Sequence, residues 1–261
     1  MRFLFIGDVV GKPGRRGLAA RLPQLRQSHS AELVIVNGEN SAGGIGIDER
    51  SAEEIFAAGA DVITLGNHAY RQRSSYELLD RDERIVRPAN YPKGNPGQGS
   101  TMIEVGGRRV GVLNLSGALG LTVARSPFPA ADAELGELER RGAELVIVDF
   151  HAEMTSEKVA LGWYLDGRVA AVLGTHTHVP TADARVLPGG TAFIADVGMT
   201  GSRQSILGVR IEDAMAGFTT QMPTRFTTAS EDVWINAVAV TIGEDGRATS
   251  IEQILESSGS S

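Results

Sequence analysis

The chain has 261 residues, of which 42% are hydrophobic and 22% are charged, and its formal net charge is −7. This composition is that of an ordinary globular protein, and the acidic balance argues against an extensive nucleic-acid-binding surface. The absence of cysteine excludes disulfides, thiolate metal sites and cysteine nucleophiles, so any bound metal must use oxygen and imidazole ligands.

The first half of the chain contains three apolar runs that are typical of buried strands, at residues 3–6, 33–36 and 62–65. A helix is predicted over residues 15–28, with a break or a second start at Pro23. A second helix is predicted over residues 48–58, with Asp48 as its N-cap, and a third over residues 73–84. Residues 88–99 are dense in turn residues, and we interpret them as a loop that acts as a lid or sets specificity.

In the second half, residues 102–105 and 110–115 predict a hairpin, and residues 130–142 a charged helix. Buried strands are predicted at residues 145–148, 169–173 and 191–195, with a helix over residues 155–166 between the first two. Residues 234–242 alternate as an antiparallel strand should. The whole predicts an α/β fold in one domain over residues 1–256, followed by a disordered tail at residues 257–261.

The N-terminal apolar run is interrupted at Asp8, which is too early for a signal peptide. No apolar run reaches the roughly 18 residues that a membrane span needs. We therefore expect a cytoplasmic location and no membrane partner. The sequence leaves a homo-oligomer open.

Polar side chains follow five of the apolar runs at the point where each run ends. They are Asp8, Glu39 with Asn40, Asn67 with His68, His151, and His176 with His178. Ligands of open α/β sheets bind outside the C-terminal strand ends, and carboxylate, amide and imidazole donors together suit manganese, iron or zinc. In extended backbone, His176 and His178 project to opposite sides, so each can serve a different ion. A carboxylate such as Glu39 can bridge two such ions, which makes the pattern typical of a two-metal hydrolytic site.

These motifs resemble the calcineurin-like metallophosphoesterases. The residues that carry the resemblance are Gly7-Asp8, Gly38-Glu39-Asn40, Gly66-Asn67-His68, His151 and Gly174-Thr175-His176-Thr177-His178. The stretches GDVVGKPGR at residues 7–15 and VNGEN at residues 36–40 are similar to the YmdB subfamily of bacterial phosphodiesterases. The resemblance extends from Phe3 to about Ile242.

The resemblance implies a four-layer α/β/β/α sandwich with mixed sheets and a dinuclear centre of divalent or trivalent first-row metal ions, with iron or manganese favoured and zinc an alternative. It assigns Asp8 and His178 to one ion, and Asn67, His151 and His176 to the other, with Glu39 as the bridge. It places His68 against the scissile phosphate, where the ring stabilises the transition state or protonates the leaving oxygen.

Two positions depart from the general superfamily pattern. Val10 stands where that pattern has a histidine, and Glu39 stands where it has a bridging aspartate. Asn40 is the natural replacement ligand, because its amide oxygen can occupy the position that Val10 leaves vacant.

The subfamily implies a metal-dependent phosphodiesterase that opens 2′,3′-cyclic nucleotides at the 2′ bond by in-line attack of a metal-bridging hydroxide. The expected partner is therefore a small phosphodiester. Two alternatives remain: a phosphomonoesterase or nucleotidase that uses the same site, and a non-catalytic, metal-bound regulator that senses nucleotides.

Other polar residues near the strand ends are weaker candidates. Asp196, Thr200 and Arg203 follow a predicted strand and are expected in the wall of a substrate pocket. Asp149 and Glu153 flank His151 and are expected to orient a metal ligand. Residues 7–13 resemble a P-loop only faintly, because the spacing is one residue short and Pro13 replaces the Ser or Thr that would hold magnesium.

Overall fold

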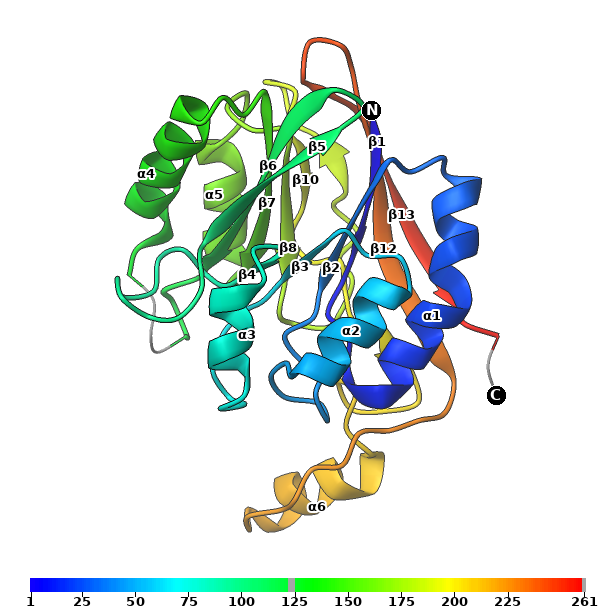
Figure 1. Cartoon of the computed structure of the whole chain (residues 1–261). Helices are drawn as coiled ribbons and strands as arrows, with labels where there is room; N and C mark the ends of the chain where they lie inside the picture. The colour runs from blue at the N-terminus through cyan, green and yellow to red at the C-terminus, as the bar shows by residue number, and fades with distance from the viewer. Residues whose placement is uncertain (122–124, 260–261) are drawn as a thin grey trace.

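The computed structural model describes residues 1–121 and 125–259 (Figure 1). Its elements follow in the order β1 (Arg2–Ile6), α1 (Gly11–Ser28), β2 (Leu33–Asn37), α2 (Glu49–Ala57), β3 (Val62–Thr64), α3 (Ser75–Arg81), β4 (Ile85–Val86), β5 (Ser100–Val105), β6 (Arg108–Ser116), α4 (Pro127–Arg140), β7 (Leu145–His151), α5 (Thr155–Tyr164), β8 (Ala171–Thr175), β9 (Arg185–Val186), β10 (Ala192–Ile194), β11 (Gly201–Ser202), α6 (Ile211–Thr220), β12 (Val233–Ile242) and β13 (Ala248–Ser257).

The described strands form two mixed sheets. The first has the order β11-β12-β1-β2-β3-β4, with β13 paired to β12, and the second has the order β5-β6-β7-β8-β10-β9. Strands β1, β2, β3 and β4 run parallel, as do β6, β7, β8 and β10. Because each sheet has a parallel centre, the C-terminal ends of its central strands meet at one edge.

Alternation along the strands builds the layers. In β1, Leu4 and Ile6 pack in the core beneath α1 and α2, whereas Phe3 and Phe5 pack in the core between the two sheets. In β7 of the second sheet, Ile147 faces the core between the sheets, and Val148 faces the core beneath α4 and α5. With helices on both outer faces, the four-layer α/β/β/α sandwich predicted from the sequence is confirmed (Figure 1).

Some local predictions were wrong. Helix α1 begins at Gly11 and continues through Pro23. The helix tolerates the hydrogen bond that Pro23 cannot donate because Leu18, Leu22 and Leu25 are buried against the sheet.

The C-terminal strand was also missed. β13 runs to Ser257 and pairs along β12, and Ser258 is buried, so the ordered chain extends beyond residue 256, where the disordered tail was expected to begin. The last two residues of that expected tail, 260–261, lie outside the described residues.

Helix α6 was not predicted, and it stands apart from the body of the molecule (Figure 1). Among the described residues, no helix combines the length and the apolar character that crossing a membrane requires.

Candidate metal centre

Both sheets contribute side chains to one site. Asp8, Glu39 with Asn40, and Asn67 with His68 follow β1, β2 and β3 of the first sheet; His151 ends β7 of the second sheet, and His176 and His178 follow β8. Gly66 shows how closely the two sheets approach here. A Cβ at Gly66 would lie 2.2 Å from Cδ2 of His151 and 2.3 Å from Oε2 of Glu39, so only glycine fits.

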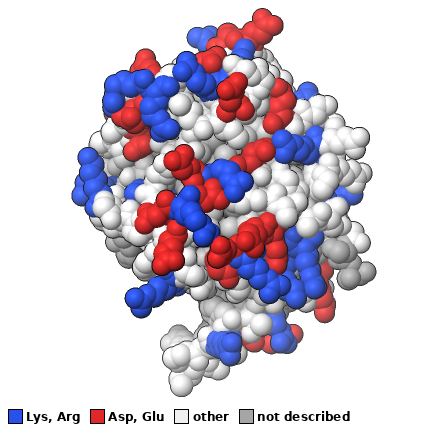
Figure 2. All heavy atoms as spheres, in the orientation of Figure 1, with Lys and Arg blue, Asp and Glu red and all other residues white. Residues whose placement is uncertain are grey.

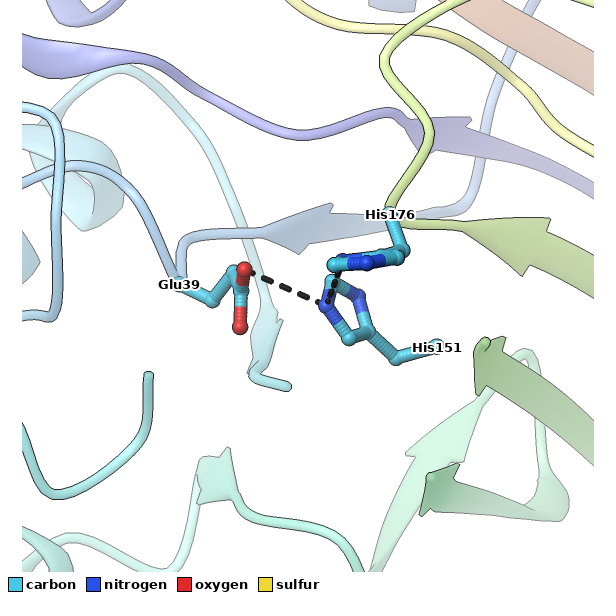
Figure 3. Close-up of side chains that lie close together, drawn as sticks. All are labelled: Glu39, His151 and His176. Carbon is cyan, nitrogen blue, oxygen red and sulfur yellow. Dashed lines mark hydrogen bonds and ion pairs between the residues drawn. The ribbon is translucent and has the colours of Figure 1, made fainter. Parts of the chain in front are cut away.

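Three ligand atoms converge on Nε2 of His151. This nitrogen lies 2.9 Å from Oδ1 of Asn67, 3.0 Å from Nδ1 of His176 and 3.1 Å from Oε1 of Glu39. Figure 3 shows how the Glu39 carboxylate and the His176 ring approach the His151 ring. A single ring nitrogen can satisfy only one hydrogen-bond partner at a time, so this convergence needs a further explanation.

The other nitrogen of His151 identifies the tautomer. The hydroxyl of Thr175 donates to Oδ1 of Asp149 at 2.7 Å, so it accepts a hydrogen bond from Nδ1 of His151 at 2.9 Å. In the neutral ring, Nε2 therefore carries a lone pair and faces the acceptor oxygen atoms of Glu39 and Asn67. Such a group of acceptors is stable only around a positive charge, either a proton or a metal ion.

A second group of donors lies on the other side of Glu39. Oδ1 of Asp8 is buried without a hydrogen-bond partner among the described residues, and it lies 3.8 Å from Nε2 of His178. The same nitrogen of His178 lies 3.1 Å from Nδ2 of Asn40, whose Oδ1 faces His68. A buried carboxylate oxygen with no partner is costly, and a coordinated cation would satisfy it.

The pKa shifts reflect this concentration of charge. Burial raises the pKa of Asp8. Burial alone would also raise the pKa of Glu39, but its contacts with His151 and His68 outweigh that effect and hold this pKa well below its usual range. Burial alone would lower the pKa of His151, but the neighbouring Glu39 carboxylate raises it to about 9.

His176 shifts in the opposite direction, because burial and the neighbouring His151 lower its pKa to about 3. In the absence of metal, a proton on His151 thus supplies the positive charge that the cluster requires, while His176 stays neutral.

His68 lies at the edge of the same group. Its Nδ1 is 2.8 Å from Oδ1 of Asn40 and 3.1 Å from Oε1 of Glu39, and its backbone N–H donates to Oε2 of Glu39 at 3.1 Å. These contacts orient the ring. His68 also lines a cavity of about 510 Å³ together with Glu39, Asn40, His176 and His178.

The loop that carries His176 and His178 is not extended, contrary to the expectation from the sequence. Both residues adopt positive φ, 101° at His176 and 67° at His178. The His176 ring contacts His151, whereas the His178 ring lies near Asp8 and Asn40. A buried ion pair anchors this loop: Nζ of Lys158 lies 2.6 Å from Oδ2 of Asp196 and donates to the carbonyl of Thr175 at 2.7 Å. The same carboxylate oxygen accepts from the backbone N–H and the hydroxyl of Thr177.

Two groups of residues expected near the substrate lie outside the lining of this cavity. The loop at residues 88–99 does not line the cavity; its Tyr91 is buried, and Asn90 bonds to the carbonyls of Ser116 and Arg125. Asp196 is buried in the ion pair with Lys158, and Thr200 is also buried. Arg203 lines an adjoining hollow that shares His178 with the cavity.

Of the two residues expected to orient a metal ligand, one acts on His151 through a bridging hydroxyl and the other contacts His176 directly. Asp149 reaches His151 through Thr175, and Oε2 of Glu153 lies 3.0 Å from Nε2 of His176. Sequence analysis missed Thr175, Lys158 and the cavity residues Leu207 and Phe226. Thr175 was detectable as part of the GTHTH motif, but the sequence carried no signal for the other three.

Comparison with known proteins is consistent with this geometry. A family model described as YmdB-like protein matches residues 4–254. The 2′,3′-cyclic-nucleotide 2′-phosphodiesterase of Bacillus subtilis is 45% identical over 98% of this chain and 97% of its own. A hypothetical protein from Thermus thermophilus, 45% identical, superposes with a TM-score of 0.93 over 98% of this chain and 99% of its own. A structure described as a novel phosphatase from Mycoplasma pneumoniae, 34% identical, superposes with a TM-score of 0.91 over 98% of this chain and 93% of its own.

Proposed function

Because the chain belongs to the YmdB-like protein family, we propose that it is a metal-dependent phosphodiesterase that hydrolyses 2′,3′-cyclic nucleotides at the bond to the 2′ oxygen. The observation that carries this proposal is the convergence of acceptor atoms on Nε2 of His151, close to a buried Asp8 oxygen that has no hydrogen-bond partner among the described residues. The name of the Bacillus subtilis relative supplies the substrate class.

The donor set fits two first-row metal ions. Asn67, His151 and His176 would hold one ion, Asp8 and His178 would hold the other, and Glu39 contacts both His151 and Asn40. Asn40 would join the second ion only with its amide rotated, because its Oδ1 faces His68 and its Nδ2 faces His178. Oxygen and imidazole donors of this kind favour iron or manganese and also accept zinc. When bound, the ions would neutralise charge on the phosphoryl oxygens and lower the pKa of water.

The chain's own residues complete the chemistry. Oδ1 of Asn40 and Oε1 of Glu39 accept from Nδ1 of His68 and orient the ring. In its imidazolium form the ring also carries a proton on Nε2, which it can donate to the departing 2′ oxygen. Asp149 and Thr175 hold the His151 ring in the tautomer whose lone pair faces the centre. Attack of a water oxygen on phosphorus, from the side opposite the 2′ oxygen, forms one P–O bond and breaks the bond to the 2′ oxygen. The 2′ oxygen takes up a proton, and the product is a nucleoside 3′-phosphate with a free 2′-hydroxyl.

A substrate panel tests the reaction type. We expect the manganese- or iron-loaded protein to convert 2′,3′-cyclic AMP to 3′-AMP and to hydrolyse a bis-aryl phosphate faster than an aryl monophosphate. Faster turnover of the monoester would favour the phosphomonoesterase alternative, and no turnover of any ester by the metal-loaded protein would favour the regulator. Elemental analysis of protein purified without added metal would identify the ions that it retains.

A further inference from the structure

The cavity that contains the candidate metal ligands also has an apolar lining. Besides the polar residues already described, it is lined by Val10, Ile45, Leu207, Val209 and Phe226. Three of these side chains are large and exposed: Ile45 at 41%, Leu207 at 50% and Phe226 at 60%. Binding a phosphate calls for charge and hydrogen-bond donors, so the phosphate does not account for this apolar lining.

Most of the apolar lining comes from one projecting segment, residues 206–229, which we call the arm. Its base is a short two-stranded stalk, in which Val209 bridges to Ile206 and Thr228. Within the stalk, the N–H of Arg210 donates to the carbonyl of Thr227, and the N–H of Ala229 donates to that of Gly208, both at 2.9 Å. The stalk carries α6 away from the sandwich (Figure 1). Leu207, Val209 and Phe226 therefore form the part of the arm that borders the metal centre.

The arm offers little to recognise the edge of a base. Its only polar side chains in the cavity lining are the hydroxyls of Thr227 and Thr228, and no charged side chain of the arm lines the cavity. On the outer surface, the tip of the protruding arm is mainly uncharged on the face shown, and charged side chains lie nearer the body of the molecule (Figure 2). A ligand that meets this wall is held by apolar and stacking contacts rather than by directed hydrogen bonds.

Resting on the proposed function, we propose that the arm's apolar wall is the nucleobase subsite, with Phe226 as the residue that stacks against the base. The cavity of about 510 Å³ is in the size range of small-molecule sites, and it is continuous with His68 and His178. Stacking accepts any base and strengthens with ring area. The subsite therefore accepts both purines and pyrimidines and favours purines.

The test compares two substrates with the same reacting ring: 2′,3′-cyclic AMP and methyl riboside 2,3-cyclic phosphate, which lacks a base. We expect kcat/KM to be about 5- to 150-fold higher for the nucleotide, the range given by stacking of one base. Phe226→Ala removes most of this advantage by raising KM for the nucleotide, leaves the baseless substrate unchanged, and is rescued by Phe226→Trp. The matched control is Phe218→Ala, because Phe218 lies on the same arm, is 72% exposed and does not line the cavity.

A binding measurement separates this proposal from the proposed function. Calorimetry on the metal-loaded protein should show that 3′-AMP binds more tightly than ribose 3-phosphate, and that Phe226→Ala removes the difference. The base subsite would be overturned if the wild type bound 3′-AMP and ribose 3-phosphate equally. It would also be overturned if Phe226→Ala lowered kcat/KM equally for the nucleotide and the baseless substrate. In both cases the phosphodiesterase assignment stands. Absence of turnover together with preferential 3′-AMP binding would overturn the phosphodiesterase assignment and support the subsite.

Discussion

The candidate metal centre and the arm border the same cavity but are built in opposite ways. Asp8, Glu39 and His151 are completely buried at the ends of central strands, and each has several contacts or ion-pair neighbours from other strands. On the arm, Phe218 is 72% exposed and Met222 is 66% exposed. A catalytic site requires ligand atoms that are held in place within fractions of an ångström, and only a rigid scaffold provides this. An apolar wall needs only a suitable shape and an apolar surface.

The largest effect is expected at the centre of the buried cluster. Glu39→Ala removes the carboxylate that contacts His151, His68 and Asn40, so metal and turnover should be lost together. Metal affinity should fall by more than about 100-fold, because loss of a residue that merely orients a ligand already costs that much. Elemental analysis after dialysis would measure it, and a fully metal-loaded, active variant would contradict the bridging role.

His68→Ala should separate chemistry from metal binding. The ring contacts Asn40 and Glu39 but is not among the atoms that converge on His151, so the metal should remain bound. The rate should fall by about 10²–10⁴-fold, the usual contribution of a general acid. The steady-state rate with 2′,3′-cyclic AMP would measure this. His29→Ala, at the far end of α1, serves as the control, and a rate unchanged from wild type would remove His68 from the reaction.

The buried ion pair beneath the histidine loop should affect stability. Lys158→Met leaves Asp196 buried without its cation, which typically costs about 3–5 kcal/mol of unfolding free energy. Urea denaturation would give the difference. Arg168→Met provides a matched control, because its partner Asp132 is exposed and such surface pairs contribute about 0–1 kcal/mol.

Metal binding should depend on pH through His151. Its pKa of about 9 means that the metal-free protein is protonated there at neutral pH, and that proton must leave before the nitrogen can coordinate. His176, with a pKa of about 3, has no proton to release. Metal affinity should therefore rise about tenfold per pH unit from pH 7 and level off near pH 9. Titrations in buffers of different ionisation enthalpy would count the protons released, and an affinity independent of pH would contradict protonation of His151 in the metal-free protein.

The smallest effect is expected at the tip of the arm. Phe218→Ser alters a side chain outside the cavity lining, so unfolding free energy should change by no more than about 0.5 kcal/mol. Thermal unfolding would measure this change. A loss as large as that expected for Lys158→Met would show that the arm packs as tightly as the sandwich and would weaken the contrast between the two regions.

Much of the site could be predicted from the sequence, because the end of a buried strand is marked locally by an apolar run followed by polar residues. Apolar runs predicted β1, β2, β3, β7 and β8, and the polar residues that follow these runs are those that the structure brings together. The alternation of side chains along a strand also determines the layers, since neighbouring residues such as Leu4 and Phe5 face different cores.

Only the tertiary structure decided how these pieces meet. Three features depend on contacts between residues far apart in the chain. Side chains from two different sheets share one site, Asp149 and Thr175 select the His151 tautomer, and Lys158 anchors the histidine loop. Helix α6 and the arm were not predicted from the sequence. The large apolar residues of the arm face solvent or the cavity rather than a core, so their spacing gives no pattern of one buried helix face. Local periodicity specifies which face of an element is apolar, whereas its partner is chosen by the packing of the whole chain.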